Sequence, residues 1–256
     1  LKQFIKINTM NVVETQNLEK LFIDAGTKVR AVDGVSINVE EGEFTAIVGP
    51  SGSGKTTLLN MIGGLDNPTK GKVQVDSVEL TDLSKNELID FRLKNIGFVF
   101  QSYNLIPVLT AYENVEFVML LQGRDSKERK ERVNELLVAV GIADKAKNRP
   151  SKLSGGQQQR VAVARALAPK PKFIIADEPT ANLDSKSAST LLDIMQQLNE
   201  KERITFLFST HDHEFAQTVA NRIIELTPKG VIDRHATFDE YLSDPKVKEL
   251  RDKMYS

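Results

Sequence analysis

The chain has 256 residues, a length that suits one large domain or one domain with an inserted lobe. Its 34 Lys and Arg residues nearly balance 35 Asp and Glu residues, so no global charge draws it to nucleic acid or anionic lipid. The sequence has no cysteine, which excludes disulfides, thiolate chemistry and cysteine-ligated zinc. No apolar run approaches the roughly 18 residues that span a bilayer, and the N-terminus lacks a secretion-signal pattern, so we expect a soluble protein.

Alternating apolar residues predict half-buried antiparallel strands in the first forty positions. The alternation runs through residues 4–13 and is strict at Val35, Ile37 and Val39. The stretch between them, residues 18–30, is polar and punctuated by glycine, and it contains the aromatic residue Phe22. By itself, Phe22 is most simply a core residue.

The next segment has the pattern of a strand, a loop and the start of a helix. An apolar run at residues 44–48 precedes a Gly-x-x-x-x-Gly-Lys-Thr loop, and an apolar helical stretch follows it. Glycines let successive backbone N–H groups point at one phosphate chain at a helix N-terminus. Lys55 would then reach the β- and γ-phosphates and Thr56 would bind Mg²⁺, which we prefer to an ordinary glycine-rich turn. The loop residues are Gly49, Pro50, Ser51, Gly52, Ser53, Gly54, Lys55, Thr56 and Thr57.

The middle of the chain changes from strands to helices at Gln101. Alternation predicts a strand at 71–75, a polar stretch at 84–94 is interpreted as a helix, and a short apolar run predicts a strand at 96–100. Beyond Gln101, the spacing of Val133, Leu136, Leu137 and Val140 is that of an amphipathic helix. We therefore expect a single domain in which 102–168 is a helical insert and 1–101 with 169–256 forms the core.

The remaining segments alternate between strands and helices, which predicts a mainly parallel sheet with crossover helices. The strands are expected at 173–176 and 204–208, with a helix around 191–198 between them. Apolar residues spaced through 238–254 predict one further helix that packs on its own domain, although a partner or regulatory role is an alternative.

Two acids follow the predicted strand at 173–176. Strand ends of a parallel sheet deliver side chains to its carboxyl edge, where ligands bind. Asp177 would help to hold Mg²⁺ through water, and Glu178 would orient or deprotonate the attacking water. A solvated pair of acids is the alternative interpretation.

A second candidate phosphate site precedes the helical stretch 158–167. The segment Leu-Ser-Gly-Gly-Gln at 153–157 places Ser154 and glycine amides at a helix N-terminus. One loop already surrounds the triphosphate, so this second cap is free to serve the nucleotide of a neighbouring subunit.

The motifs at 49–56, 101, 153–157, 177–178, 181–184 and 211 occur in the order of an ABC ATPase, and the chain resembles that family over nearly its whole length. The segment 153–157 is the most specific of them. The resemblance implies an α/β RecA-like P-loop NTPase fold with a mainly parallel sheet, an N-terminal antiparallel β subdomain and an inserted helical subdomain. It also implies a head-to-tail homodimer or heterodimer that encloses two ATP molecules with Mg²⁺.

The resemblance further assigns roles to single residues. Phe22 would stack on adenine, Gln101 would sense Mg²⁺ and the γ-phosphate, and His211 would be the γ-phosphate switch. Asn182 departs from the small residues common in relatives, whereas Asp184 is retained. The implied catalytic residues are Lys55, Gln101, Glu178 and His211. The implied Mg²⁺ site consists of Thr56, Gln101 and, through water, Asp177. The residues implied to contact the neighbour's ATP are Ser154, Gly155, Gly156, Gln157 and Asp184.

Segments 64–66, 98–107 and 110–115 look like the lipoprotein-release and macrolide-export branch, which cell-division ATPases also resemble. In that branch the ATPase drives a membrane permease, so we expect residues 101–113 to contact a permease and the chain to lie on the cytoplasmic face of the membrane. The alternative for this segment is that its apolar side chains only close the helical lobe.

Two other classes compete with transport. ABC proteins of chromosomes carry a very long coiled coil, and those of ribosomes usually carry two ATPase domains, neither of which is evident in this sequence. We expect no nucleic-acid partner, because the basic excess that backbone binding needs is lacking. A hydrolysis-dead subunit is a further alternative, but Ser154, Glu178 and His211 are all present.

Overall fold

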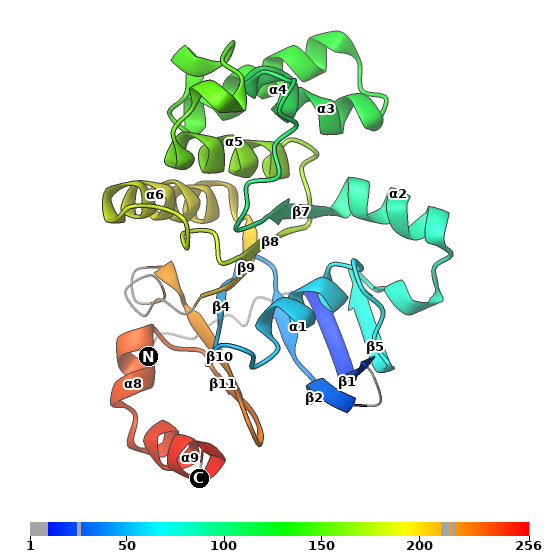
Figure 1. Ribbon diagram of the computed structural model, residues 1–256, viewed down its shortest axis with the longest axis vertical. Helices are drawn as coiled ribbons and strands as arrows, with labels where there is room; N and C mark the ends of the chain where they lie inside the picture. The colour runs from blue at the N-terminus through cyan, green and yellow to red at the C-terminus, as the bar shows by residue number, and fades with distance from the viewer. Residues whose placement is uncertain (1–9, 25–26, 211–215, 217–218, 256) are drawn as a thin grey trace, which may run out of the picture.

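The computed structural model describes residues 10–24, 27–210, 216 and 219–255 (Figure 1). Its strands form two sheets, and the helices lie around them. The strand predicted at the extreme N-terminus lies partly outside the described residues.

The larger sheet has the strand order β11-β10-β4-β9-β8-β7. Neighbouring strands are parallel throughout, except for the antiparallel pair β10 and β11. Every residue of β4 and of β9 is buried, as expected of strands that are covered on both faces. The prediction of a mainly parallel sheet is confirmed. The strands are β4 (Phe44–Val48), β7 (Ile96–Val99), β8 (Phe173–Asp177), β9 (Thr205–Ser209), β10 (Arg222–Thr227) and β11 (Gly230–Arg234).

Two apolar clusters cover the opposite faces of this sheet. Along β4, Phe44, Ala46 and Val48 belong to one cluster, whereas Ile47 belongs to the other, because successive strand residues point to opposite faces. The first cluster includes residues of the helices between β7 and β8 and of the C-terminal helices. The second includes the helix after β4 and the smaller sheet, so it connects the two sheets.

The smaller sheet is antiparallel and has the order β2-β1-β5-β6, with β3 paired to β1. The polar, glycine-punctuated stretch at 18–30 is mostly strand, because β1 and β2 form a hairpin with pairs from Leu18↔Val35 to Asp24↔Thr27. Backbone pairing thus outweighs the weak side-chain pattern. The strands are β1 (Asn11–Asp24), β2 (Thr27–Val35), β3 (Asn38–Glu40), β5 (Lys70–Val75) and β6 (Val78–Glu79).

Helices form all of the regular structure between β7 and β8. Several begin with a residue whose side chain caps the first turn, as Thr110 does for α3 and Ser154 does for α5. Figure 1 shows α3, α4 and α5 gathered at the end of the molecule opposite β1 and β2, with α6 beside the sheet. The helices are α1 (Lys55–Ile62), α2 (Lys85–Asn95), α3 (Ala111–Leu121), α4 (Ser126–Ala139), α5 (Gly155–Leu167) and α6 (Ser185–Glu202).

The C-terminal segment forms two helices, α8 (Phe238–Ser243) and α9 (Pro245–Tyr255), and not the single helix that was predicted. The break falls at Pro245, which has no N–H to donate to a preceding turn. Both helices pack near β10 and β11, with Tyr241 and Val247 buried in the first cluster. None of the helices in the described ranges combines the length and apolar composition that crossing a bilayer requires.

Candidate functional site

The glycine-rich loop at 49–56 connects the carboxyl end of β4 to the first turn of α1. Gly54 has φ 94°, and a Cβ there would lie 2.0 Å from the carbonyl oxygen of Ala31, so a larger residue does not fit. No side chain of the described part of the chain caps α1, whose N-cap is Gly54. The first N–H groups of this helix are therefore available to an anion.

Lys55 is the first residue of α1, and its side chain folds back over the loop. Its Nζ donates to the carbonyl oxygens of Gly49 (2.9 Å) and Pro50 (3.0 Å). The residue is buried, so the ammonium group is held against the loop by backbone oxygens. This position lets the cation exchange carbonyl partners for phosphate oxygens.

Asp177 ends β8 beside the phosphate loop. Its Oδ1 accepts hydrogen bonds from the Thr56 hydroxyl (3.1 Å) and the Ser209 hydroxyl (2.5 Å). The structure therefore brings together Thr56 and Asp177, which the sequence analysis assigned to one Mg²⁺ site. A hydroxyl and a carboxylate are hard oxygen ligands of the kind that Mg²⁺ accepts, so these two residues fit that ion.

Ser209 belongs to the site although sequence reasoning missed it. It ends β9 and is the register partner of Asp177 in the parallel pair β8 and β9. Adjacent parallel strands end at the same edge, so strand register was the signal that could have identified it. Its buried hydroxyl donates to Asp177 and accepts from the Glu178 N–H (3.0 Å).

Glu178 directly follows β8 with a left-handed backbone, φ 45°. This conformation is uncommon for a residue other than glycine and is maintained by its surroundings. The Glu178 N–H donates to both the carbonyl and the hydroxyl oxygen of Ser209, which anchors the backbone of this acid. The backbone therefore turns away from the direction of β8 at Glu178, directly after Asp177.

Gln101 follows β7 at the start of the helical segment and is exposed. Its carbonyl oxygen accepts from the Asn182 side chain at 3.0 Å, which ties this turn to the loop after β8. The amide of Gln159, a second residue that sequence reasoning missed, donates to the carbonyl oxygens of Pro179 (2.7 Å) and Phe100 (3.3 Å). Gln159 therefore connects α5 to the same two segments.

Ser154 is the N-cap of α5. Its hydroxyl accepts from the Gln157 N–H (3.3 Å), and the Gln157 side chain accepts from the Ser154 N–H (2.9 Å). This reciprocal pair is a capping box, so Ser154 and Gln157 stabilise the start of α5. The same two residues belong to the anion site that the sequence predicts at this helix N-terminus.

Asp184 is the N-cap of α6 and lies near the segment 154–157. It accepts from the N–H (3.0 Å) and the hydroxyl (2.7 Å) of Ser187. The hydrogen bonds from Ser187 lower the pKa of Asp184. A Cβ at Gly156 would lie 2.7 Å from the Ser187 hydroxyl, so only glycine allows this approach. Gly156 and Asp184 therefore belong to one continuous surface.

Phe22 and His211 are the remaining residues of the predicted site. Phe22 lies on β1 with 44% of its surface exposed, and Lys20 Nζ lies 5.1 Å from its ring centroid. Lys20 thus lies over one face of the ring, and the exposed part of the ring is available for stacking. His211 lies outside the described residues, although the preceding Thr210 is buried at the end of β9.

Comparison with known proteins identifies the family to which this chain belongs. The model of a family described as ABC transporter matches residues 32–181. Lipoprotein-releasing system ATP-binding protein LolD 1 of Chlorobium chlorochromatii is 45% identical over 212 residues, which are 82% of this chain and 84% of that protein. Macrolide export ATP-binding/permease protein MacB of Mannheimia succiniciproducens is 45% identical over 88% of this chain but only 34% of its own length.

A solved structure agrees with the fold. It is the dimeric post-hydrolysis state of the ATP-binding cassette MJ0796 bound to ADP and Pi, a protein of Methanocaldococcus jannaschii. The two chains share 44% identity with a TM-score of 0.77, over 84% of this chain and 94% of that one. The chain therefore belongs to the ABC transporter family and is an ATP-binding, ATP-hydrolysing subunit of that family.

Proposed function

We propose that this subunit dimerises around two ATP molecules with Mg²⁺ and drives a membrane permease of the lipoprotein-release or macrolide-export type. The names of LolD 1 and MacB support this type, and the name of MacB joins an ATP-binding part and a permease in one protein. A cell-division type of coupling, without transport, is the alternative and would use the same ATP chemistry.

Hydrolysis would use the residues around the loop at 49–56. Lys55 would leave the carbonyl oxygens of Gly49 and Pro50 and stabilise the charge of the γ-phosphate. Glu178 would orient the attacking water or accept its proton. Thr56 and Asp177 would hold Mg²⁺, with Gln101 as its sensor, and the ion would neutralise phosphate charge. His211 and Phe22 would contact the γ-phosphate and adenine.

The dimer proposal rests on the surface formed by the segment 154–157 and Asp184. Ser187 lies between them, hydrogen-bonded to Asp184 and close to Gly156. A second copy would present its ATP to this surface, so that each site combines two chains. The titles of two solved relatives describe dimers, which supports this arrangement.

The observation that carries the permease proposal is the exposed apolar side chain of Val108 in the proposed contact segment. Val108 exposes 68% of its surface in the proposed contact segment, residues 101–113, and Leu120 and Leu121 are exposed on the following helix α3. Val108 thus leaves apolar surface in this segment that a partner protein would cover. We further propose that 102–168 is a helical lobe inserted into a core of 1–101 and 169–256.

A crosslinking experiment tests the permease contact. The chain has no cysteine, so Val108→Cys supplies a single attachment point for a short photoreactive maleimide. In native membranes with ATP, we expect a crosslink to an integral membrane protein, since a permease would hold the chain at the cytoplasmic face of the membrane.

Val138→Cys is the matched control, because Val138 exposes 67% of its surface on α4, outside the proposed contact segment. Equal labelling of membrane proteins from both positions would contradict the proposed contact. Crosslinks from Val108→Cys to ribosomal proteins, or to a DNA-bound complex, would favour the competing classes.

A further inference from the structure

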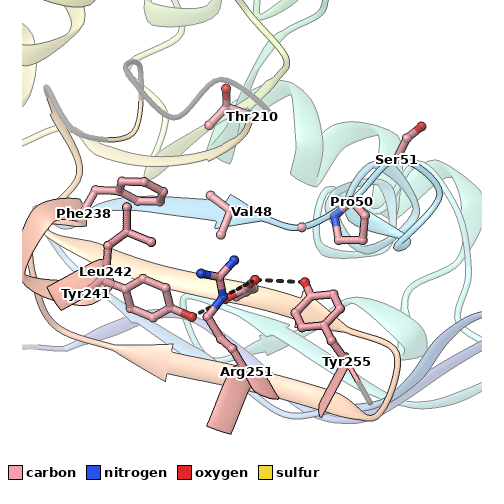
Figure 2. A pocket seen from close by; sticks show the side chains of 11 residues that line it. Val48, Pro50, Ser51, Thr210, Phe238, Tyr241, Leu242, Arg251 and Tyr255 are labelled. Carbon is pink, nitrogen blue, oxygen red and sulfur yellow. Dashed lines mark hydrogen bonds and ion pairs between the residues drawn. The ribbon is translucent and has the colours of Figure 1, made fainter. Parts of the chain in front are cut away.

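A cavity of about 330 Å³ lies between the start of the phosphate loop and the C-terminal helices (Figure 2). Residues 48–51 form one wall, and side chains of α8 and α9 form the other. Figure 2 shows Tyr241, Arg251 and Tyr255 pointing toward one another below Val48 and Pro50. The C-terminal helices thus lie directly beside the loop that would bind the phosphates.

These three side chains meet on one acid, Glu225 of β10, which is only 3% exposed. The hydroxyl groups of Tyr241 and Tyr255 both donate to its carboxylate, the latter at 2.9 Å. Arg251 Nε lies 3.1 Å from Glu225 Oε2, and it comes from α9. Burial, followed by the hydrogen bond to Glu225, raises the pKa of Tyr255 to about 12, so this hydroxyl keeps the proton that it donates.

Glu225 is also next to the phosphate loop. It is the register partner of Val48, the last residue before Gly49. The following carbonyl oxygen, that of Leu226, would lie 2.6 Å from a Cβ at Gly49. The same stretch of β10 therefore carries a carboxylate and forms the wall behind the first turn of the loop.

A carboxylate beside an anion-binding loop disfavours the binding of phosphates unless a cation compensates it. In this structure Arg251 is the cation paired with Glu225, and the two tyrosine hydroxyls satisfy the remaining carboxylate lone pairs. Glu225 is buried, although Arg251 exposes 37% of its side chain, so removing Arg251 leaves a buried carboxylate without its cation.

We propose that Arg251 is a positioning residue for ATP binding: by docking α9 onto β10, it neutralises Glu225 and braces the strand that supports Gly49. Affinity for ATP then depends on the C-terminal helices, which contribute no residue to the predicted site itself. Whatever displaces α9 would weaken ATP binding without touching the phosphate loop.

The test uses the variant Arg251→Gln in the full chain. We expect the Kd for ATP and the KM for ATP hydrolysis to rise about three- to tenfold, with kcat within about twofold, because the effect acts on phosphate binding. Affinity for adenosine should stay unchanged, since adenosine carries no phosphate. Lys248→Gln is the matched control, because it removes one positive charge from an exposed position of α9 and should leave both affinities unchanged.

A double variant makes the test decisive. Glu225→Gln combined with Arg251→Gln removes both charges, so it should regain ATP affinity within about twofold of the wild type. Equal losses for ATP and adenosine, or no loss at all in Arg251→Gln, would overturn the proposal. If Arg251→Gln does not fold, Tyr255→Phe decides instead: it keeps the ring, and it should raise the Kd for ATP but not for adenosine.

Discussion

At the scale of single residues, the two acids after β8 are held in different ways. One oxygen of Asp177 accepts from both Thr56 and Ser209, which fixes this side chain toward the phosphate loop. Glu178 is fixed through its backbone, by two hydrogen bonds to Ser209 and a left-handed φ. This difference agrees with the separate roles proposed for them, an ion ligand and a residue that positions water.

We predict that Glu178→Gln keeps ATP binding but lowers ATP turnover by about a hundred- to a thousandfold, because the amide cannot accept the proton of water. Phosphate release under steady-state conditions measures turnover, and size-exclusion chromatography with ATP should show an accumulated dimer.

Glu131→Gln, on an exposed part of α4, is the control for a change of charge and should hydrolyse ATP normally. Phosphate release by Glu178→Gln at the wild-type rate would remove Glu178 from the mechanism.

At the scale of elements, helix starts position much of the site. Ser154 is the N-cap of α5 and Asp184 is the N-cap of α6, and each caps its helix through its side chain. An N-cap side chain satisfies an N–H group that the helix leaves unpaired, and a negative charge there also interacts favourably with the helix dipole. The residues expected to face a neighbour's ATP thus also stabilise this chain.

The cap of α6 predicts a pH dependence. Hydrogen bonds from Ser187 depress the folded-state pKa of Asp184 below the value of about 3.9 that is usual for an unfolded chain. Its contribution to the free energy of unfolding is therefore fully present from about pH 5 upward and is lost as the pH falls through the folded-state pKa.

Asp184→Asn isolates this contribution, because Asn caps helices about as well without a charge. Urea unfolding should show that the wild type has the higher free energy of unfolding at pH 6 and that its advantage over Asp184→Asn is smaller at pH 3. The other acids are common to both proteins, so their titration cancels in the comparison. A stability difference that does not change with pH would contradict the prediction.

At the scale of the whole molecule, the ATP site is expected to need two chains. Lys55 would act on the ATP of its own chain, and Ser154 on the ATP of the neighbour. Lys55→Ala and Ser154→Arg should each be inactive alone for different reasons. In a mixed dimer, one site would carry both defects and the other would carry none.

We predict that mixing Lys55→Ala with Ser154→Arg restores ATPase activity to about a quarter of the wild-type rate, if half of the dimers are mixed and each has one intact site. Each variant at the doubled concentration is the control. A mixture no more active than its components would argue against sites shared between chains.

Much of the site could be predicted from the sequence because its motifs are local. The loop at 49–56, the capped helix at 154–157 and the acids after β8 are each formed by neighbouring residues, whose spacing determines what their backbone can do. The mainly parallel sheet was likewise predictable, since strands buried on both faces are continuously apolar.

The tertiary structure alone decided which distant residues join these motifs. Ser209 contacts Asp177 because the two residues are register partners in the parallel pair β8 and β9. Gln159 donates to the carbonyl oxygen of Pro179 because α5 packs beside the turn that contains Pro179. The C-terminal pattern predicted a helix but not its contact with Glu225, which depends on how α9 docks on β10. No local pattern encodes such contacts, because they arise only when segments far apart in the chain pack together.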